Sequence, residues 1–292
     1  MYLQKYPYKD RFKFEFYISR GCPYQCAFCA TNYDFRSYNF KNFRDYFENL
    51  CEIVQNYNSK NLKIGFADQS FERVLISEKV LDYIVNNDFQ DRFAFSCQSR
   101  VEVALENPKI YEKLIKCKMV VGYGLETVNK GLLKEMHKTD TPAKYVEIMK
   151  ETIKKYKIYN DIYCRLNLLV GFPGETQETF DETINFLNGN ALHENIQISP
   201  SFFANYPNVF VYKNMEYYEK KFGTKFIRNW WKLESNSFKN AVPQKSSKNF
   251  SLKQMLGDYR DKYTSILKAS KRNTLSELVI WKRFYNNWYN EL

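Results

Sequence analysis

Three cysteines lie within eight residues near the N-terminus, in the stretch Cys22-Pro-Tyr-Gln-Cys26-Ala-Phe-Cys29. A structural zinc site normally has four ligands, and no fourth ligand is at hand. The other cysteines and both histidines stand singly along the chain: Cys51, Cys97, Cys117, Cys164, His137 and His193. Iron–sulfur clusters are held by thiolates at such short spacings. The stretch therefore predicts a four-iron cluster with three protein ligands, which leaves one iron open to bind another molecule.

The composition of the chain is that of a globular protein with an unusually aromatic character. It has 292 residues, of which 44% are hydrophobic and 18% aromatic. Seven cysteines are an odd number, which argues against a disulfide framework. The N-terminus lacks the pattern of a signal peptide, and no apolar run is long enough to span a membrane. We expect a cytoplasmic protein with one large α/β domain and an appendage.

Strand-like and helix-like segments alternate along the first 200 residues. The strands are predicted at 13–20, 62–67, 93–97, 119–125, 162–172 and 194–199. Helical patterns separate them, one with Pro108 in its first turn and one closed by Gly189. This alternation predicts a parallel sheet built from right-handed strand–helix–strand units.

The cysteine stretch resembles the signature of the radical SAM family, C-x-x-x-C-x-aromatic-C after the first barrel strand. Arg20-Gly21 before the first cysteine and Phe28 before the last one match as well. The turns GLET (124–127) and GFPGET (171–176) resemble those of the cobalamin-linked and coproporphyrinogen-oxidase-like branches. The resemblance covers roughly residues 12–200 and implies an α/β fold with a partial (β/α)6 TIM-like barrel.

The resemblance also implies cofactors and a class of reaction. One 4Fe-4S cluster would bind S-adenosylmethionine (SAM) at its free iron, and reduction would release a 5′-deoxyadenosyl radical that takes hydrogen from a substrate. A small reductant protein of the flavodoxin or ferredoxin type would supply the electron. The outcome would be an epimerisation, dehydrogenation, rearrangement or carbon–carbon bond formation.

Ligands in such folds lie at the carboxyl ends of the strands, and this rule selects candidate SAM-binding residues. They are Phe28, Asp68, Ser99, Arg100, Glu126, Lys138, Asn167, Gly171 and Ile198. By resemblance, Asp68 accepts from the SAM ammonium, Lys138 binds its carboxylate and Asn167 its ribose, while Phe28 and Ile198 line the adenine. The alternative for the polar residues of this set is a structural role, in which they cap turns, form ion pairs or make a buried hydrogen bond.

Residues 201–292 differ from the rest of the chain in charge. They carry 17 basic and 7 acidic residues, a net charge of +10, whereas residues 1–200 carry 27 and 26, a net charge of +1. Twenty of these 92 residues are aromatic. Two helices are predicted, one capped by Ser251 and one opened by Thr274 and Glu277. We therefore expect an α-helical, basic extension over the opening of a barrel formed by residues 1–200.

The extension favours an anionic substrate or partner. Trp230 and Trp231, between Arg228 and Lys232, are the expected contact, and such interleaving also suits nucleic acid. The alternative is that the aromatic residues form the core of a helical hairpin and the lysines its solvated face.

Three functions stay open at this point. The first is a radical SAM enzyme that acts on an unknown, anionic substrate. The second is a cobalamin-dependent radical methyltransferase, although no Asp-x-His-x-x-Gly stretch is visible, which argues against cobalamin. The third is a non-catalytic iron–sulfur protein that binds nucleic acid. Sulfur transfer is disfavoured because the scattered cysteines offer no second cluster site.

Overall fold

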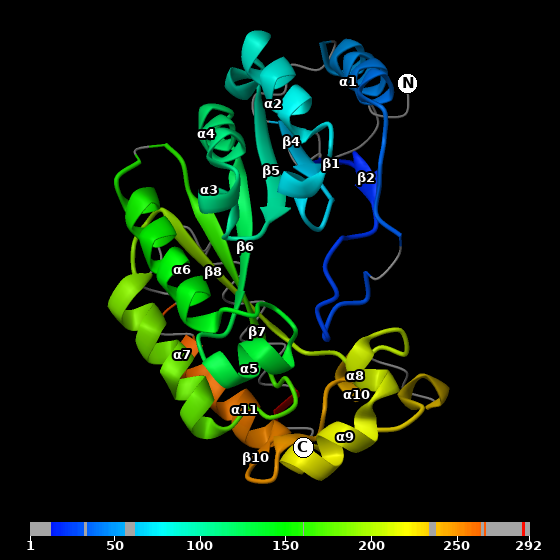
Figure 1. Cartoon of the computed structure of the whole chain (residues 1–292), viewed down its shortest axis with the longest axis vertical. Coiled ribbons are helices and arrows are strands. Elements are labelled where there is room, and N and C mark those ends of the chain that lie inside the picture. Colours follow the sequence, from blue (N-terminus) through cyan, green and yellow to red (C-terminus); the bar gives the residue numbers. More distant parts are fainter. Residues whose placement is uncertain are drawn as a thin grey trace. The chain divides into compact units, whose positions relative to one another are not determined.

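The structure is a computed structural model that describes residues 13–31, 34–55, 62–159, 161–233, 238–263, 266 and 288–289. The chain divides into two compact units (Figure 1). The first unit comprises residues 1–24, 31–124 and 160–164, and the second comprises 25–30, 125–159 and 165–292. The second unit thus joins the last strands to the extension, and the predicted boundary at residue 200 stays a prediction.

One six-stranded sheet forms the centre of the fold, with the order β1-β4-β5-β6-β7-β8. Its strands are β1 (Lys13–Phe16), β4 (Leu62–Phe66), β5 (Phe93–Ser99), β6 (Val120–Glu126), β7 (Cys164–Val170) and β8 (Ile196–Phe202). The pairs β1/β4, β4/β5 and β5/β6 are parallel. The strands lie side by side in chain order, as in a partial (β/α)6 barrel. The predicted α/β fold with six strands is confirmed.

Phenylalanine side chains hold α1 (Phe40–Gln55) against the strands of the first unit. The ring centroid of Phe47 in this helix lies 5.8 Å from that of Phe93 and 6.2 Å from that of Phe95, both in β5. The other helices of this unit are α2 (Ser77–Asn86), α3 (Val103–Glu106) and α4 (Pro108–Lys116). Pro108 opens α4 as predicted. A short antiparallel pair, β2 (Ser19–Arg20) with β3 (Arg36–Ser37), was not expected, because two residues show no periodicity.

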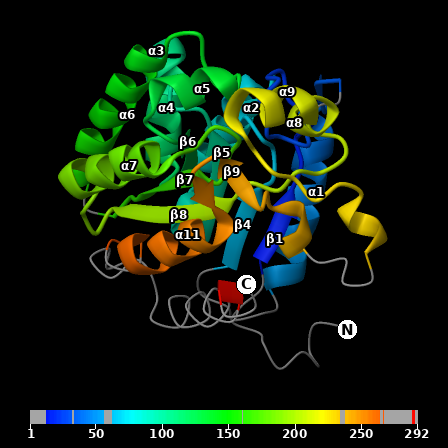
Figure 2. The same ribbon diagram turned by 90° about the horizontal axis from the view of Figure 1, so that it is seen from below.

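The second unit contains most of the helices. They are α5 (Lys130–Glu135), α6 (Pro142–Lys157), α7 (Gln177–Asn190), α8 (Phe210–Lys213), α9 (Met215–Phe222), α10 (Phe238–Ala241) and α11 (Leu252–Asp258). Figure 2 shows α6 and α7 along one face of β7 and β8. The pair β9 (Lys245–Ser247) and β10 (Phe250–Ser251) precedes α11.

The end of α7 and the start of α11 were both predicted from single residues. Helix α7 passes through Gly189 and ends at Asn190, so the predicted end was wrong. Gly189 does not adopt the left-handed conformation that would stop a helix. Ser251 caps α11 as predicted, because its Oγ accepts from the backbone N–H of Gln254. The second C-terminal helix, with Thr274 and Glu277, lies outside the described residues.

Strands β5, β7 and β8 each have one buried face and one more open face, whereas β4 and β6 are buried over most of their length. In β5, Phe93, Phe95 and Cys97 are buried, whereas Ser96 and Gln98 are half-buried. Gln98 stands opposite Gly122 of β6, where a Cβ atom would lie 2.5 Å from the Gln98 Oε1. Glycine at position 122 therefore makes room for a polar side chain on the open face.

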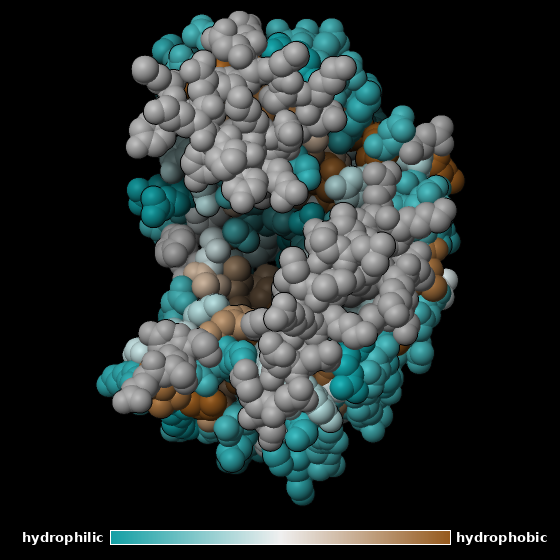
Figure 3. Space-filling view, turned by 180° about the vertical axis from the view of Figure 1, so that it is seen from behind, coloured by the Kyte–Doolittle hydropathy of each residue, from teal (hydrophilic) through white to brown (hydrophobic). Residues whose placement is uncertain are grey.

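None of the helices in the described part is long and apolar enough to cross a membrane. The coloured residues on the face seen in Figure 3 are mainly hydrophilic, with apolar residues in small groups.

Candidate cofactor-binding and active site

The cysteine loop begins directly after β2, at Gly21, whose φ of 81° is most easily adopted by glycine. Cys22, Cys26 and Cys29 are half-buried, whereas the other four cysteines are buried. Burial raises the pKa of Cys117 to about 12, and the other buried thiols shift in the same direction. These four thus stay protonated and make poor metal ligands.

No three His, Cys, Asp or Glu side chains of the described residues are gathered closely enough to hold a metal ion. The choice of ligands therefore depends on the motif and on the chemistry of the thiols. Cys22, Cys26 and Cys29 fit a cluster in both respects, because they are accessible and correctly spaced for thiolate ligation.

In the second unit, neighbouring segments hold the backbone of the loop between Cys26 and Ala30. The Ala27 N–H donates to the Met136 carbonyl at 2.8 Å, and the Ala27 carbonyl accepts from the Val211 N–H at 3.2 Å. The Asn208 side chain donates to the Ala30 carbonyl at 2.9 Å. Residues of the extension thus fix the loop that carries two of the three motif cysteines.

A buried ion pair lies beside the same loop. The Lys138 Nζ is 3.0 Å from the Glu126 Oε1, and these side chains are 7% and 10% exposed. The ammonium also lies 5.9 Å from the centre of the Phe28 ring. Glu126 has a φ of 61°, in the left-handed region, at the end of β6. The structure thus brings together three of the predicted SAM-binding residues.

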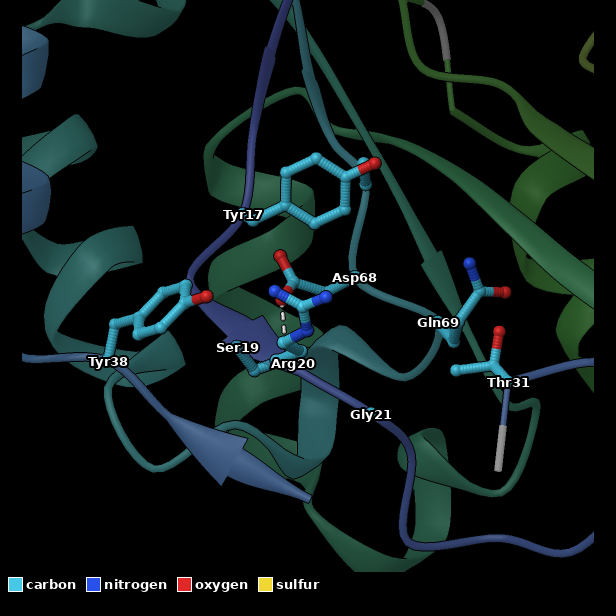
Figure 4. Close-up of a pocket in the computed structure, with 9 residues that line it drawn as sticks. Tyr17, Ser19, Arg20, Gly21, Thr31, Tyr38, Asp68 and Gln69 are labelled. Atoms are coloured by element: carbon cyan, nitrogen blue, oxygen red, sulfur yellow. Dashed lines mark hydrogen bonds between the residues drawn. The ribbon is translucent and has the colours of Figure 1, made fainter. Parts of the chain in front are cut away.

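Asp68 lies in the first unit, where it borders a cavity of about 390 Å³ (Figure 4). Its carboxylate accepts from the Ser19 hydroxyl at 2.5 Å and from the Ile18 N–H at 3.1 Å. Burial raises the pKa of Asp68, and these hydrogen bonds oppose the shift. The side chain therefore supports the chain just before the cysteine loop, and its contact with the SAM ammonium stays a prediction.

Ser99 and Arg100 follow β5 and approach Tyr24, a residue of the cysteine loop. The Arg100 guanidinium lies 4.1 Å from the centre of the Tyr24 ring and pairs with Glu102 at 2.6 Å. The Tyr24 hydroxyl accepts from the Arg73 Nε at 2.7 Å. The Ser99 hydroxyl donates to the Arg100 carbonyl. Arg100 is thus engaged by protein groups that position the loop.

Glu72 is an unexpected carboxylate next to this group. Burial raises its pKa to about 7, while the nearby Ser99 hydroxyl and the Arg73 charge oppose the shift. Neither carboxylate oxygen makes a hydrogen bond of good geometry. The side chain is therefore poised between its neutral and charged forms near neutral pH.

The predicted residues of β7 lie at its carboxyl end. Asn167 is half-buried on the open face, four residues before Gly171. Gly171 has a φ of 81° and donates its N–H to the Glu175 side chain at 2.5 Å. Burial raises the pKa of Glu175 to about 8. The Ser246 hydroxyl donates to the Glu175 carbonyl, so the extension also fastens this turn.

Ile198 occupies the buried face of β8, with Ile196 and Phe202, and is 2% exposed. The open face of β8 carries Gln197 and Ser199 instead. The Ile198 side chain therefore does not reach the open face, and a contact with the adenine stays a prediction.

The two tryptophans of the extension pack inside the second unit. Trp230 is buried and donates its Nε1–H to the Asn205 carbonyl at 3.0 Å. Trp231 is half-buried and lies 5.5 Å from the ring of Tyr212. Arg228 pairs with Glu219 at 2.6 Å. This arrangement favours the structural alternative for these aromatic residues.

Sequence reasoning missed several of the residues that shape the site. Glu175 was visible in GFPGET, and its burial and contact with Gly171 give it a structural role. Tyr24 stands between two ligands, but its two arginine partners come from distant positions. Asn208 and Val211 lie in a stretch without clear periodicity, so the sequence held no signal for them.

Comparison with known proteins gives one family and several partial relatives. The family model of the radical SAM superfamily matches residues 16–187. An uncharacterized methyltransferase of Pyrococcus horikoshii is 26% identical over 171 residues, which are 58% of this chain and 35% of that protein. The ribosomal protein uS12 methylthiotransferase RimO of Dictyoglomus thermophilum is 26% identical over 177 residues, 58% and 39% of the two chains.

A solved structure, coproporphyrinogen III oxidase (HemN) from Escherichia coli, is 12% identical with a TM-score of 0.48 and covers 73% of this chain and 49% of its own. The chain thus spans less than half of the length of each of these proteins. The family model, by contrast, matches more than half of the chain and includes the cysteine motif. The chain therefore belongs to the radical SAM superfamily.

Proposed function

We propose that this chain is an enzyme that binds one 4Fe-4S cluster through Cys22, Cys26 and Cys29, with SAM beside it, and acts on an anionic substrate. The single observation that carries the proposal is the cysteine motif, with three accessible thiols on a loop fixed at Ala27 from both sides. When bound, the reduced cluster would supply the electron that cleaves the SAM sulfonium to methionine and a 5′-deoxyadenosyl radical. A flavodoxin- or ferredoxin-type protein would donate that electron.

The residues of the second unit suit distinct parts of SAM. The Lys138 ammonium has three donors and is held by Glu126 beside Phe28, so it can bind a carboxylate at this point of the loop. Asn167 offers a half-buried amide for the ribose hydroxyls on the open face of β7. Asp68, in the first unit, would accept from the SAM ammonium.

Reductive cleavage of SAM is the direct test. The protein is reconstituted without oxygen using iron and sulfide, reduced with dithionite, and assayed for 5′-deoxyadenosine. We expect about four iron atoms per chain and product from the wild type, and neither from the Cys22→Ala, Cys26→Ala, Cys29→Ala triple variant. Cys51→Ala is the matched control, because Cys51 is buried on α1. A wild type that holds the full cluster but forms no 5′-deoxyadenosine would refute the proposal.

Methyl transfer is the second candidate, because two of the relatives are named for methyl or methylthio transfer. Transfer of the SAM methyl group would leave S-adenosylhomocysteine, which the same assay can measure. Bound cobalamin would be visible in the absorption spectrum. About eight iron atoms per chain would indicate a second cluster and would favour sulfur transfer.

A further inference from the structure

The open face of β7 and β8 in the second unit is polar where a packed strand would be apolar. On β7, the half-buried face carries Arg165, Asn167 and, nearest the carboxyl end, the apolar Leu169, and these positions alternate with fully buried residues. On β8, Gln197 and Ser199 alternate with buried isoleucines in the same way. Strands that only packed against other elements would be apolar on both faces. The polar residues therefore indicate a face that meets a ligand or water.

Arg165 is the charged residue of this face. Its Nε donates to the Gln197 Oε1 at 3.1 Å, so the side chain crosses from β7 to β8. Among the residues that the structure describes, Gln197 is its hydrogen-bond partner and no carboxylate forms an ion pair with it. Other arginines of the chain are paired, such as Arg100 with Glu102 and Arg228 with Glu219.

The geometry leaves the two terminal nitrogens of the guanidinium available. Gln197 engages Nε, and the Nη1 and Nη2 groups form a planar fork that matches a carboxylate or a phosphate. A half-buried guanidinium has already lost part of its hydration, so binding an anion stabilises its charge. The side chain is thus preorganised for one anionic group.

We propose that Arg165, held by Gln197, binds a carboxylate or phosphate group of the substrate. The proposal deepens the proposed function, because it assumes that the open face is the substrate side. Two residues along a strand span roughly 7 Å, so Arg165 lies about that far from Asn167, the residue proposed for the ribose. The anionic group would therefore lie on the side of Asn167 that faces away from the Gly171 turn.

Protection of Arg165 from chemical modification tests this assignment. The anaerobically reconstituted protein is treated with phenylglyoxal, which modifies guanidinium groups, and the rate at each arginine is followed by peptide mass spectrometry. Inorganic phosphate and succinate are the two anionic probes, and succinamide is the neutral control. Saturating phosphate or succinate should slow modification of Arg165 about tenfold, since a bidentate pair covers the reacting nitrogens. Stronger protection by phosphate or by succinate would tell which group the substrate carries.

Arg228 is the internal control, because its partner Glu219 is part of the protein. Its rate should not respond to either probe. In Gln197→Ala, protection of Arg165 should need several times more probe, because the guanidinium is no longer held. Equal protection by succinamide, equal effects at Arg228, or no saturable protection of Arg165 would overturn the proposal. The 5′-deoxyadenosine assay is read separately, so failure of SAM cleavage and failure of anion binding remain distinguishable.

Discussion

The Lys138–Glu126 pair allows a quantitative test of the cofactor site. Both side chains are at least nine-tenths buried, and their charged atoms are 3.0 Å apart. Removing one member of a buried pair leaves an uncompensated charge, which typically costs about 3–5 kcal/mol. Lys138→Met keeps the length of the side chain and removes its charge. We therefore expect the free energy of unfolding to fall by about this amount, measured by urea unfolding of the cluster-free protein.

The double variant Lys138→Met, Glu126→Gln should recover most of that loss, because neither buried charge remains. SAM affinity should behave differently, since the cation is absent from the single and the double variant alike. A charge-assisted contact is worth about 1.5–3 kcal/mol, so both variants should bind SAM roughly ten- to a hundredfold more weakly. Calorimetry on the reconstituted protein measures this affinity. Additive stability effects would refute the coupling of the pair, and unchanged SAM affinity would refute the role of Lys138.

Two further predictions concern the second unit. The pKa of Glu175 is raised from 4.5 to about 8 in the folded protein, so the folded protein keeps a proton that the unfolded chain releases between these pH values. The free energy of unfolding of the wild type should therefore fall as the pH rises from 4.5 to about 8. Urea unfolding of Glu175→Gln should no longer show this pH dependence. The net charge of +10 in residues 201–292 should give RNA binding that weakens steeply as the salt concentration rises. Trp230→Phe should not change the RNA affinity, because the indole is packed inside the protein. RNA binding that does not depend on salt, or loss of RNA binding in this variant, would contradict that account.

The fold was largely predictable because strand and helix patterns repeat clearly before residue 200. Apolar strands such as β6 and capped helices such as α4 depend on local sequence, and local sequence was sufficient to find them. The ends of elements were less predictable. Gly189 has the chemistry of a helix stop, yet α7 continues through it because the backbone there keeps its helical conformation.

The candidate site was predictable only where chemistry and short spacing coincide. The three cysteines were predicted from their spacing, Glu126 from the end of a strand, and Lys138 from the resemblance to the radical SAM family. Arg165 was not found, because one arginine in an apolar strand has no motif of its own. Its position became informative when β8 placed Gln197 against its Nε. The role of such a residue depends on contacts between distant segments of the chain, and sequence periodicity does not reveal those contacts.

The extension contributes to the cluster site in a way that its charge did not indicate. Its basic residues favour a role toward an anionic partner, but the contacts found here are made by backbone and neutral groups. In the cysteine loop, the Ala27 carbonyl accepts a hydrogen bond from Val211 and the Ala30 carbonyl accepts one from Asn208. Ser246 donates a hydrogen bond to the turn at Glu175. A cluster ligand works only if its sulfur is held in place, and a loop without regular structure cannot hold itself. Positioning of this loop therefore belongs to residues after position 200 as much as to the strands before it.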